Sequence, residues 1–523
     1  MKQKSITYLA VFSLIFSLIA CKVGPNYQTP KIASPEIFRY ENNAIDSITN
    51  LKWWELFQDP VLDSLISVAL RENKDVLIAA SRIEEARANL GFNKADYGPK
   101  IGVQGFAGAT NFNGADVSNS TNKSFEASGT FNWEIDFWGK YRRSTEAAKA
   151  GMLSSFYGKR TVEIGLISEI ARNYFQLINY RTSLAVSRNT LEIRNNALTI
   201  IQNRFNEGYT NIIDVNQAQI QKAIALAAIP VYEREIAFIE NNLSVLLGKN
   251  SQTINVNTSY EEYPLPQEIP AGIPSELLQR RPDLLQSEQL YKQQNAIIGV
   301  ATAMRFPSIS LTGLLGVGSS DMSNLLSNGL GWGAGANLLG PVFEWGKNAR
   351  RVDIERERAK QYLLSYERDV LLAFNDVNNA LTGISTYKDE LAAYRLMLDA
   401  SSNASKLSYQ RYFQGVTSYL EVIENQRQEF EAELQYSRNY QDLLIAYVNL
   451  YQSLGGGWIT ENEIEKYAAQ VAKERGVDVN TIDRDSLIYQ GQIVDYYLTP
   501  EQEKARKAQA KAQRKLERKA NKK

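Results

Sequence analysis

Hydrophobic positions change their spacing along the chain, and these changes predict where helices and strands lie. Between 61 and 95 the apolar residues recur at helical spacing, which predicts a helix. From Phe125 to Phe137 every second residue is apolar or Gly, while polar residues occupy the positions between them, which predicts a strand. The same alternation from Ile101 predicts a partner strand. A loop rich in Gly, Asn, Ser and Asp at 111–124 is expected to join the two.

A very long helix is predicted from 140 to 207, where the chain contains no proline. Apolar residues recur there every seven positions, which is the period of a coiled coil. These residues are Ile170, Leu177, Leu184, Leu191, Leu198 and Phe205. At 1.5 Å per residue the helix would be about 100 Å long. It is expected to stop at Gly208, as at a glycine cap. A second helix should then return over 211–248, with a kink at Pro230.

The whole pattern occurs twice at an almost constant offset. Trp138-Gly139-Lys140 recurs 207 residues later as Trp345-Gly346-Lys347, and Arg204–Thr210 recurs as Arg411–Thr417. We therefore expect a first repeat at 61–250, a linker at 251–274 and a second repeat at 275–456. The expected strands are about 99–110 and 123–138, then 307–318 and 330–344. The expected long helices are 140–207 and 211–248, then 346–413 and 418–454.

The N-terminus has the pattern of a bacterial lipoprotein signal. Lys2 and Lys4 precede an apolar run of signal-peptide length that ends in Leu18-Ile19-Ala20-Cys21. Cys21 is the only cysteine of the chain and stands where a lipobox requires one. We expect a signal peptide at 1–20, lipid attachment at Cys21 and a lipid-anchored segment at 21–60. The alternative is an ordinary signal peptide followed by an incidental cysteine.

Composition argues against an enzyme. The chain contains no His, which removes the commonest general base and metal ligand. It also lacks a phosphate-binding loop and a nucleophile elbow. Its 58 basic residues balance its 58 acidic ones, so no overall field favours nucleic acid. We expect no catalytic residue, no cofactor, no metal site and no nucleic-acid partner.

The predicted strands have the length needed to cross a bilayer at a tilt, with one apolar face for lipid and one polar face for water. The polar face would carry Glu126, Glu134 and Asp136 into a channel lumen. A half-buried soluble sheet would show the same alternation and remains the alternative. Four strands are too few to close a membrane barrel, so several copies must share one.

Several short motifs resemble the TolC-like outer-membrane factors, in particular the lipoprotein branch found in tripartite efflux systems. They are Val23-Gly24-Pro25-Asn26-Tyr27, Trp53-Trp54, Phe57-Gln58-Asp59-Pro60 and Arg280-Arg281-Pro282-Asp283-Leu284. The resemblance implies a mainly α fold with membrane β, built from a duplicated helix–strand–strand–long helix–helix unit. It also implies a homotrimer, in which a 12-stranded β-barrel continues into a long α-helical barrel. Its partners would be outer-membrane lipid, a periplasmic adaptor (membrane fusion) protein and an inner-membrane RND-type pump.

The resemblance also implies two functional regions near the glycine turns. The tip that contacts the adaptor would be formed by Arg204, Gly208, Thr210, Arg411, Gly415 and Thr417. An acidic gate would be formed by Glu421 and Glu424, with Asp214 equivalent to Glu421 in the first repeat. The alternative role for the tip residues is helix capping. The alternative role for the carboxylates is to stabilise the positive ends of helices.

We therefore interpret the chain as the outer-membrane channel of a tripartite efflux pump, a passive exit duct for drugs or other small molecules. Residues 457–523 leave the repeat and end in a basic tail. Two alternatives remain open, namely the exit duct of a type I protein-secretion system and a structural coiled-coil envelope lipoprotein.

Overall fold

The computed structural model describes residues 22–30, 57–113, 116–256, 263–266, 274–327 and 329–456, with a few isolated positions besides. The signal peptide, Cys21, Trp53 and Trp54 lie outside the described residues, as does most of the C-terminal extension. The helices are α3 (Pro60–Glu72), α4 (Lys74–Ala95), α5 (Lys140–Asn206), α6 (Ile212–Leu246), α7 (Pro274–Arg280), α8 (Pro282–Ala303), α9 (Lys347–Phe413) and α10 (Tyr419–Ser453). The strands are β1 (Lys100–Asn113), β2 (Asp116–Ile135), β3 (Ser308–Ser319) and β4 (Gly331–Leu339), and a 3₁₀ helix, η1 (Met322–Asn324), precedes β4.

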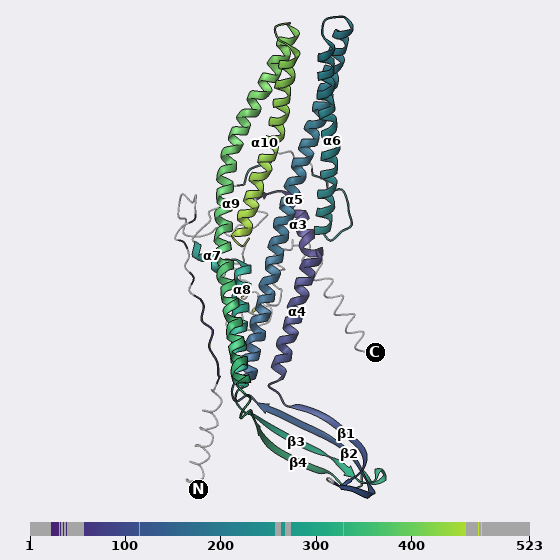
Figure 1. Cartoon of the computed structure of the whole chain (residues 1–523), viewed down its shortest axis with the longest axis vertical. Helices are drawn as coiled ribbons and strands as arrows, with labels where there is room; N and C mark the ends of the chain where they lie inside the picture. The colour runs from purple at the N-terminus through teal and green to yellow at the C-terminus, as the bar shows by residue number, and fades with distance from the viewer. Residues whose placement is uncertain are drawn as a thin grey trace.

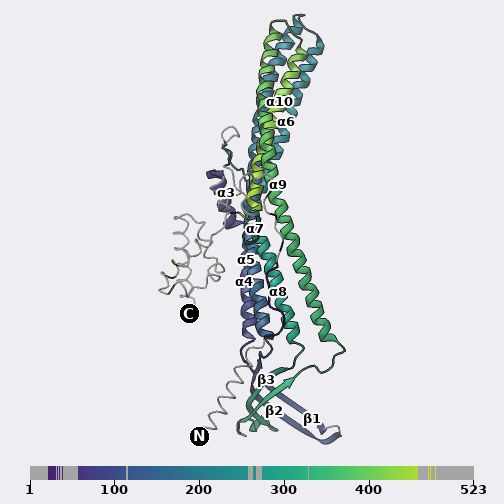
Figure 2. The same ribbon diagram turned by 90° about the vertical axis from the view of Figure 1, so that its left-hand side faces the viewer.

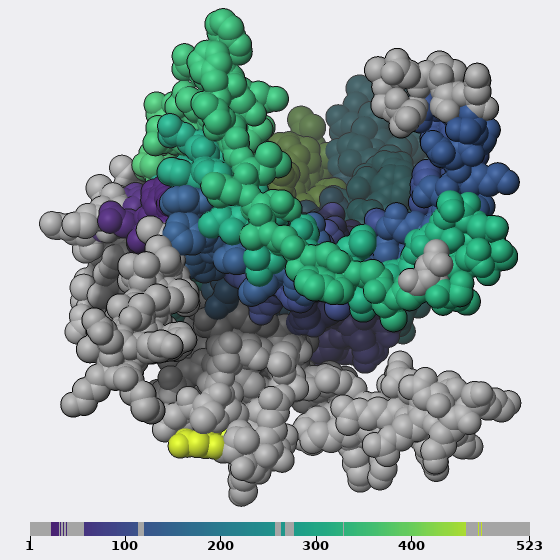
Figure 3. All heavy atoms as spheres, turned by 90° about the horizontal axis from the view of Figure 1, so that it is seen from below, coloured from purple at the N-terminus to yellow at the C-terminus, as the bar shows by residue number. Residues whose placement is uncertain are grey.

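The molecule is long and narrow, with the sheet at one end and two helical turns at the other (Figure 1). The helices α5 and α6 form one hairpin, and α9 and α10 form a second beside it. The two hairpins lie side by side in Figure 1 and overlap in Figure 2, so the distal part is a thin wall. Seen from the sheet end, the described chain is an open arc with a hollow side (Figure 3).

The two hairpins have matching bounds. Both α5 and α9 contain 67 residues, and both α6 and α10 contain 35. Each long helix begins after a glycine with positive φ, 78° at Gly139 and 79° at Gly346. The turns between the helices use Gly208 at φ 80° and Gly415 at φ 73°, a left-handed conformation that glycine adopts without steric cost. Helix α6 passes through Pro230 as one helix.

The heptad positions of α5 are most deeply buried midway along the helix. Ile170 and Leu177 have no exposed surface, and Val377 on α9 is equally buried. They belong to the main hydrophobic core, in which α3 and α10 pack against α5 and α9. Nearer the turns the heptad positions of α5, from Leu184 to Phe205, are half-buried. A small separate core there joins the two hairpins, around Ile201, Val215 and Val422.

The prediction of one helix over 61–95 is wrong, because the chain breaks at Asn73. This residue is extended at ψ 133°, and its side-chain Oδ1 accepts hydrogen bonds from the N–H groups of Asp75 and Val76. Asn73 is therefore the N-cap that ends α3 and starts α4. Its Nδ2 also donates to Leu246 O, 2.9 Å away at the end of α6. Gly248 fits closely against this break, since a Cβ there would lie 2.4 Å from Glu72 O.

The predicted loop at 111–124 is also wrong. β1 continues to Asn113 and β2 begins at Asp116, so the first hairpin extends well beyond its apolar part. Polar side chains are compatible with a hairpin that projects into water, because the backbone supplies the pairing there. In the second repeat, the chain beyond Ser319 forms a loop that contains η1. The strand expected to reach 138 ends at Ile135, which leaves Asp136 at the start of the helical region.

Candidate functional site: the sheet, its junction and the helical tip

The register of the sheet places most of its apolar side chains on one face, although Phe106 and Leu314 lie on the other. The strand order is β1-β2-β3-β4 and every neighbouring pair is antiparallel. Directly opposite residues share a face. One row across the sheet is Ile101, Phe131, Gly313 and Ala334, and another is Val103, Gly129, Leu315 and Trp332. On this face Val103 is 92% exposed and Trp332 79%, whereas Phe131 nearer the middle of the sheet is 37% exposed. This face is therefore available to a surrounding apolar medium.

The opposite face carries polar side chains. Gln104 Nε2 donates to Glu126 Oε1 at 3.4 Å, and Asn337 Nδ2 donates to Thr312 Oγ1 at 3.3 Å. The sheet thus places Glu126 on its polar face, as the alternation predicts. Within the described chain the outer edges of β1 and β4 have no strand partner.

Glu134 and Asp136 take part in the junction between the sheet and α5. Glu134 accepts hydrogen bonds from Lys140 Nζ at 3.0 Å and from the Tyr141 hydroxyl at 2.8 Å. Asp136 accepts from the backbone N–H groups of Tyr141 and Arg142, so it caps the first turn of α5. These two carboxylates therefore have a local structural role, whichever solvent they face.

Aromatic side chains surround the same junction. The Trp138 ring stacks on Phe306 with centroids 4.5 Å apart, and its Nε1 donates to Pro307 O at 2.8 Å. Trp133 Nε1 donates to Tyr97 O, also at 2.8 Å. Rings with a polar N–H at a strand end match the aromatic girdle of membrane barrels.

The segment that follows Cys21 docks at this junction through Arg143. The side chain of Arg143 is 1% exposed and donates to Val23 O at 3.1 Å, Gly24 O at 3.0 Å and Asn26 Oδ1 at 3.0 Å. Gly24 lies against Gly299 on α8, where an added Cβ would be 2.5 Å from the Gly299 Cα. The segment Val23–Tyr27 therefore lies across α5 and α8 and is held there mainly through its backbone; we call it the strap.

The tip residues contact one another within and between the repeats. The Arg204 guanidinium lies 4.7 Å from the centre of the Tyr412 ring, which joins the first turn to the second. Thr210 donates to Asp214, and Thr417 makes the equivalent bond to Glu421. Arg411 Nη1 lies 3.1 Å from Glu421 Oε1. Gly208 and Gly415 form the turns themselves.

The two glutamates among the three gate candidates are ion-paired in this chain, while the third candidate, Asp214, accepts the hydrogen bond from Thr210. Glu421 pairs with Arg411, and Glu424 receives two hydrogen bonds from Arg427, at 2.6 and 3.0 Å. The bonds from Arg427 and Gln428 lower the pKa of Glu424 to about 2. Glu424 therefore stays ionised across the physiological range. The sequence interpretation omitted Arg427, although its position three residues after a Glu on a helix was a signal for the pair.

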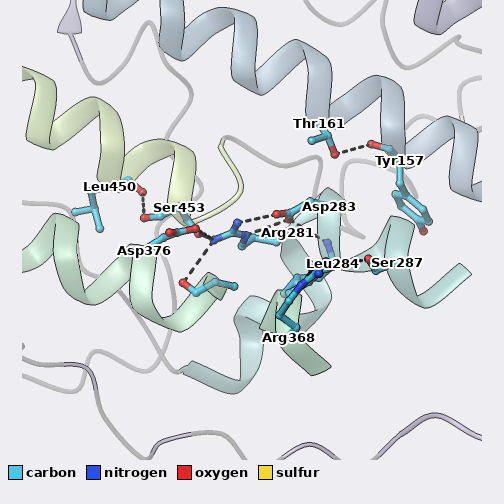
Figure 4. Close-up of polar contacts among 12 residues, drawn as sticks. Tyr157, Thr161, Arg281, Asp283, Leu284, Ser287, Arg368, Asp376, Leu450 and Ser453 are labelled. Carbon is cyan, nitrogen blue, oxygen red and sulfur yellow. Dashed lines mark hydrogen bonds and ion pairs between the residues drawn. The ribbon is translucent and has the colours of Figure 1, made fainter. Parts of the chain in front are cut away.

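The motif that opens the second repeat forms a polar cluster between helices (Figure 4). Arg281 donates to both carboxylate oxygens of Asp283, at 3.0 and 2.6 Å, and to Asp376 Oδ2 on α9 at 3.0 Å. It also reaches Ser453 O at the end of α10, 3.4 Å away. A cleft of about 450 Å³ lies beside it, lined in part by Arg172 and Asp442. Because Arg281 ties α8 to α9 and α10, the cluster has a structural role.

Among the described helices, we find none with both the length and the apolar character of a bilayer span. In the same part of the chain, no three His, Cys, Asp or Glu side chains are grouped as metal ligands would be.

A sheet with one apolar exposed face, joined through an aromatic junction to a thin wall of long helical hairpins, defines the class of outer-membrane channels. Comparison with known protein families leads to the same class. The profile described as outer membrane efflux protein matches residues 65–249 and 273–456. The chain belongs to this outer membrane efflux protein family, and it is an outer-membrane channel component of an efflux pump.

The match with this chain covers almost the full length of each of the following relatives. The outer membrane protein OprJ of Pseudomonas aeruginosa is 31% identical over 459 residues, which cover 85% of this chain and 95% of OprJ. The cation efflux system protein CusC of Escherichia coli is 29% identical over 461 residues, covering 86% and 98%. The solved open state of the MtrE outer-membrane channel of Neisseria gonorrhoeae is 26% identical with a TM-score of 0.76, covering 84% of this chain and 98% of MtrE.

Proposed function

We propose that the chain assembles as a homotrimer whose copies share one 12-stranded barrel and one helical tube. The unpaired outer edges of β1 and β4 carry this proposal, because an open sheet edge in lipid would leave backbone groups without hydrogen-bond partners. Each copy supplies four strands, and pairing β4 of one copy with β1 of the next removes every edge. The matching hairpins support a division into two repeats, at 61–250 and 275–456.

The assembly is a passive duct that belongs to a tripartite pump. The helical tip, from Arg204 to Thr210 and from Arg411 to Thr417, contacts a periplasmic adaptor protein. An inner-membrane RND-type pump supplies the energy. The cargo is small molecules, since relatives are named for cations, toluene and antibiotics. Cys21 carries the lipid anchor, and Glu126 lines the lumen with Glu134 and Asp136.

The channel mouth is gated by the carboxylates of Glu421 and Glu424, together with Asp214 in the first repeat. Arg427 pairs with both Glu424 and Glu431, whereas Arg411 pairs with Glu421. Removing Glu421 and Glu424 therefore takes away the acidic partner of Arg411 and lowers the negative charge of the mouth. We expect the variant Glu421→Ala/Glu424→Ala to open more often and to shift its ion selectivity away from cations.

Single-channel recording in a planar bilayer tests this gate. Conductance and reversal potential in a salt gradient are compared for the wild type, the double variant and Glu84→Ala. The last is a matched control, because Glu84 forms the same (i, i+3) pair with Arg87 on α4, far from the tip. Unchanged conductance and reversal potential in the double variant would contradict the gate. A purified wild type without any conductance would contradict the channel itself.

A further inference from the structure

A buried arginine without a carboxylate partner lies where the two hairpins meet. In the described part of the chain two arginines are almost fully buried, Arg143 at 1% exposure and Arg194 at 3%. Arg143 pairs with Glu146 and also donates to the strap. Arg194 on α5 donates through Nη1 to the neutral amide oxygen of Gln221 on α6. Burial lowers the pKa of Arg194 from its usual value, because its positive charge has lost water without gaining an ion pair.

One edge of the Arg194 guanidinium is unused. Its Nε is buried and has no hydrogen-bond partner among the described residues. Because Nη1 is engaged by Gln221, the edge that remains is formed by Nε and Nη2, and a carboxylate can accept from both of these groups at once. A buried donor without an acceptor is unfavourable, so a ligand that supplies the acceptor is stabilised there.

Arg194 lines a cleft of about 500 Å³, which we call the arginine cleft. Its walls come from α5, α9 and α10, so it lies between the two hairpins that Figure 1 shows side by side. Ile193, Tyr409 and Phe430 provide apolar and aromatic surface, and Lys406 on α9 provides a second cation. A cleft of this volume with a few polar groups has the size and character of a small-molecule site.

The acidic side chains of the cleft limit the charge of a ligand. Glu429 and Glu433 on α10 line it together with Arg194 and Lys406, so two acids face two bases. Within the described structure neither acid forms an ion pair with Arg194. A ligand with several negative charges would be repelled by the two acids, whereas a single carboxylate can bind Arg194 with less repulsion.

The second repeat shows that the packing of the hairpins does not require an arginine here. The counterpart of Arg194, 207 residues later, is Ser401 on α9. Ser401 is also buried, and its hydroxyl donates to Leu398 O at 3.1 Å. A small side chain with a local backbone partner is therefore sufficient at the equivalent position. The unpaired charge of Arg194 is particular to the first repeat and to this cleft.

We propose that the arginine cleft binds a small monocarboxylate with an apolar or aromatic body. The carboxylate accepts from Nε and Nη2 of Arg194, and the body packs against Ile193, Tyr409 and Phe430. A bound molecule contacts both hairpins and so adds an interaction between them. All lining residues belong to one copy, so the site goes beyond the proposed function and is independent of the trimer.

Fluorine NMR with 4-fluorobenzoate tests the site in the full-length, detergent-solubilised protein. The wild type should change the fluorine signal in a saturable way, and unlabelled benzoate should reverse the change. 4-Fluorobenzyl alcohol, which lacks the carboxylate, should show no saturable change. Arg194→Gln should weaken binding at least tenfold, because a charge-assisted pair is lost. Arg188→Gln is the matched control and should bind as the wild type does, since Arg188 is an exposed arginine on α5 paired with Glu233.

A second variant keeps the test valid if Arg194→Gln fails to fold. Glu429→Gln leaves Arg194 in place and removes a negative charge from the cleft, so it should bind 4-fluorobenzoate several-fold more tightly than the wild type. No saturable binding to the wild type would overturn the proposal, as would equal weakening in Arg194→Gln and Arg188→Gln. Binding that appears only in Glu429→Gln would also overturn it, because Glu429 would then itself occupy the free edge of Arg194.

Discussion

Replacing Asp59 by Ala should loosen α3 from the long helix α5. Asp59 Oδ1 accepts hydrogen bonds from Val61 N at 2.8 Å and Leu62 N at 3.3 Å, which makes it the N-cap of α3. Its Oδ2 accepts the hydroxyl of Tyr174 at 2.6 Å, and Tyr174 on α5 has no exposed surface. One side chain thus both starts α3 and holds it against α5.

The expected loss is the sum of these two roles. An N-cap replaced by Ala costs about 1 kcal/mol. A buried hydroxyl left without a partner costs about 1–3 kcal/mol. Together they reduce the free energy of opening α3 by about 2–4 kcal/mol, which accelerates amide exchange roughly 30- to 1,000-fold. Asp59→Asn should cost less than about 1 kcal/mol, because Asn is an equally good N-cap and can still bond the hydroxyl.

Hydrogen–deuterium exchange with mass spectrometry of the detergent-solubilised protein measures this opening in peptides that cover α3. Asp75→Ala, an exposed carboxylate in the first turn of α4, is the control and should leave α3 unchanged. If Asp59→Ala exchanged at the wild-type rate, or if Asn were as harmful as Ala, the capping role would be refuted.

Three further results are expected. Burial, and then the neighbouring Asp59, raise the pKa of Asp63 to about 6, so the folded state loses stability as pH rises from about 4 to about 6. Above pH 6 the free energy of unfolding of Asp63→Asn, measured by thermal denaturation, should therefore exceed that of the wild type by roughly 1 kcal/mol, after allowance for solvent screening. The gain should vanish below pH 4. Gly248→Ala should lower the melting temperature through its clash with the α3–α4 break, whereas Gly329→Ala, at a similar positive φ but with open space around it, should lower it less. Gly24→Ala should displace the strap, so that trypsin can cut after Lys22. Mass spectrometry should then find a chain that begins at Val23. Equal cutting in the wild type, or in Gly329→Ala, would contradict the strap.

The hairpins could be predicted from the sequence because their signals are local and occur twice. A seven-residue period specifies each long helix, and Gly208 and Gly415 end it at the only residue type that adopts positive φ freely. The bounds found for the four long helices lie within two residues of those predicted. The alternation around Phe131 likewise gave the apolar and polar faces of the sheet.

The remaining features depend on contacts that no local pattern contains. The polar residues 111–113 and 116–124 are strand because β1 and β2 pair through their backbones, and a stretch that is polar throughout has no apolar–polar alternation from which a strand could be predicted. Arg143 is buried because a segment 120 residues away supplies its acceptors. The pair of Glu424 with Arg427 did have a local signal in their helical spacing, but the sequence analysis considered the carboxylate alone. The break at Asn73 did have a local signal, since Asn is a strong N-cap, but the continuing apolar period obscured it.

Electron microscopy of the detergent-solubilised protein extracted from membranes tests whether three copies form one hollow duct. We expect a hollow particle with threefold symmetry, whose helical tube is about 100 Å long, as a helix of this length requires. A monomeric particle or a solid rod would contradict it, because the open edges of β1 and β4 would then have no partner.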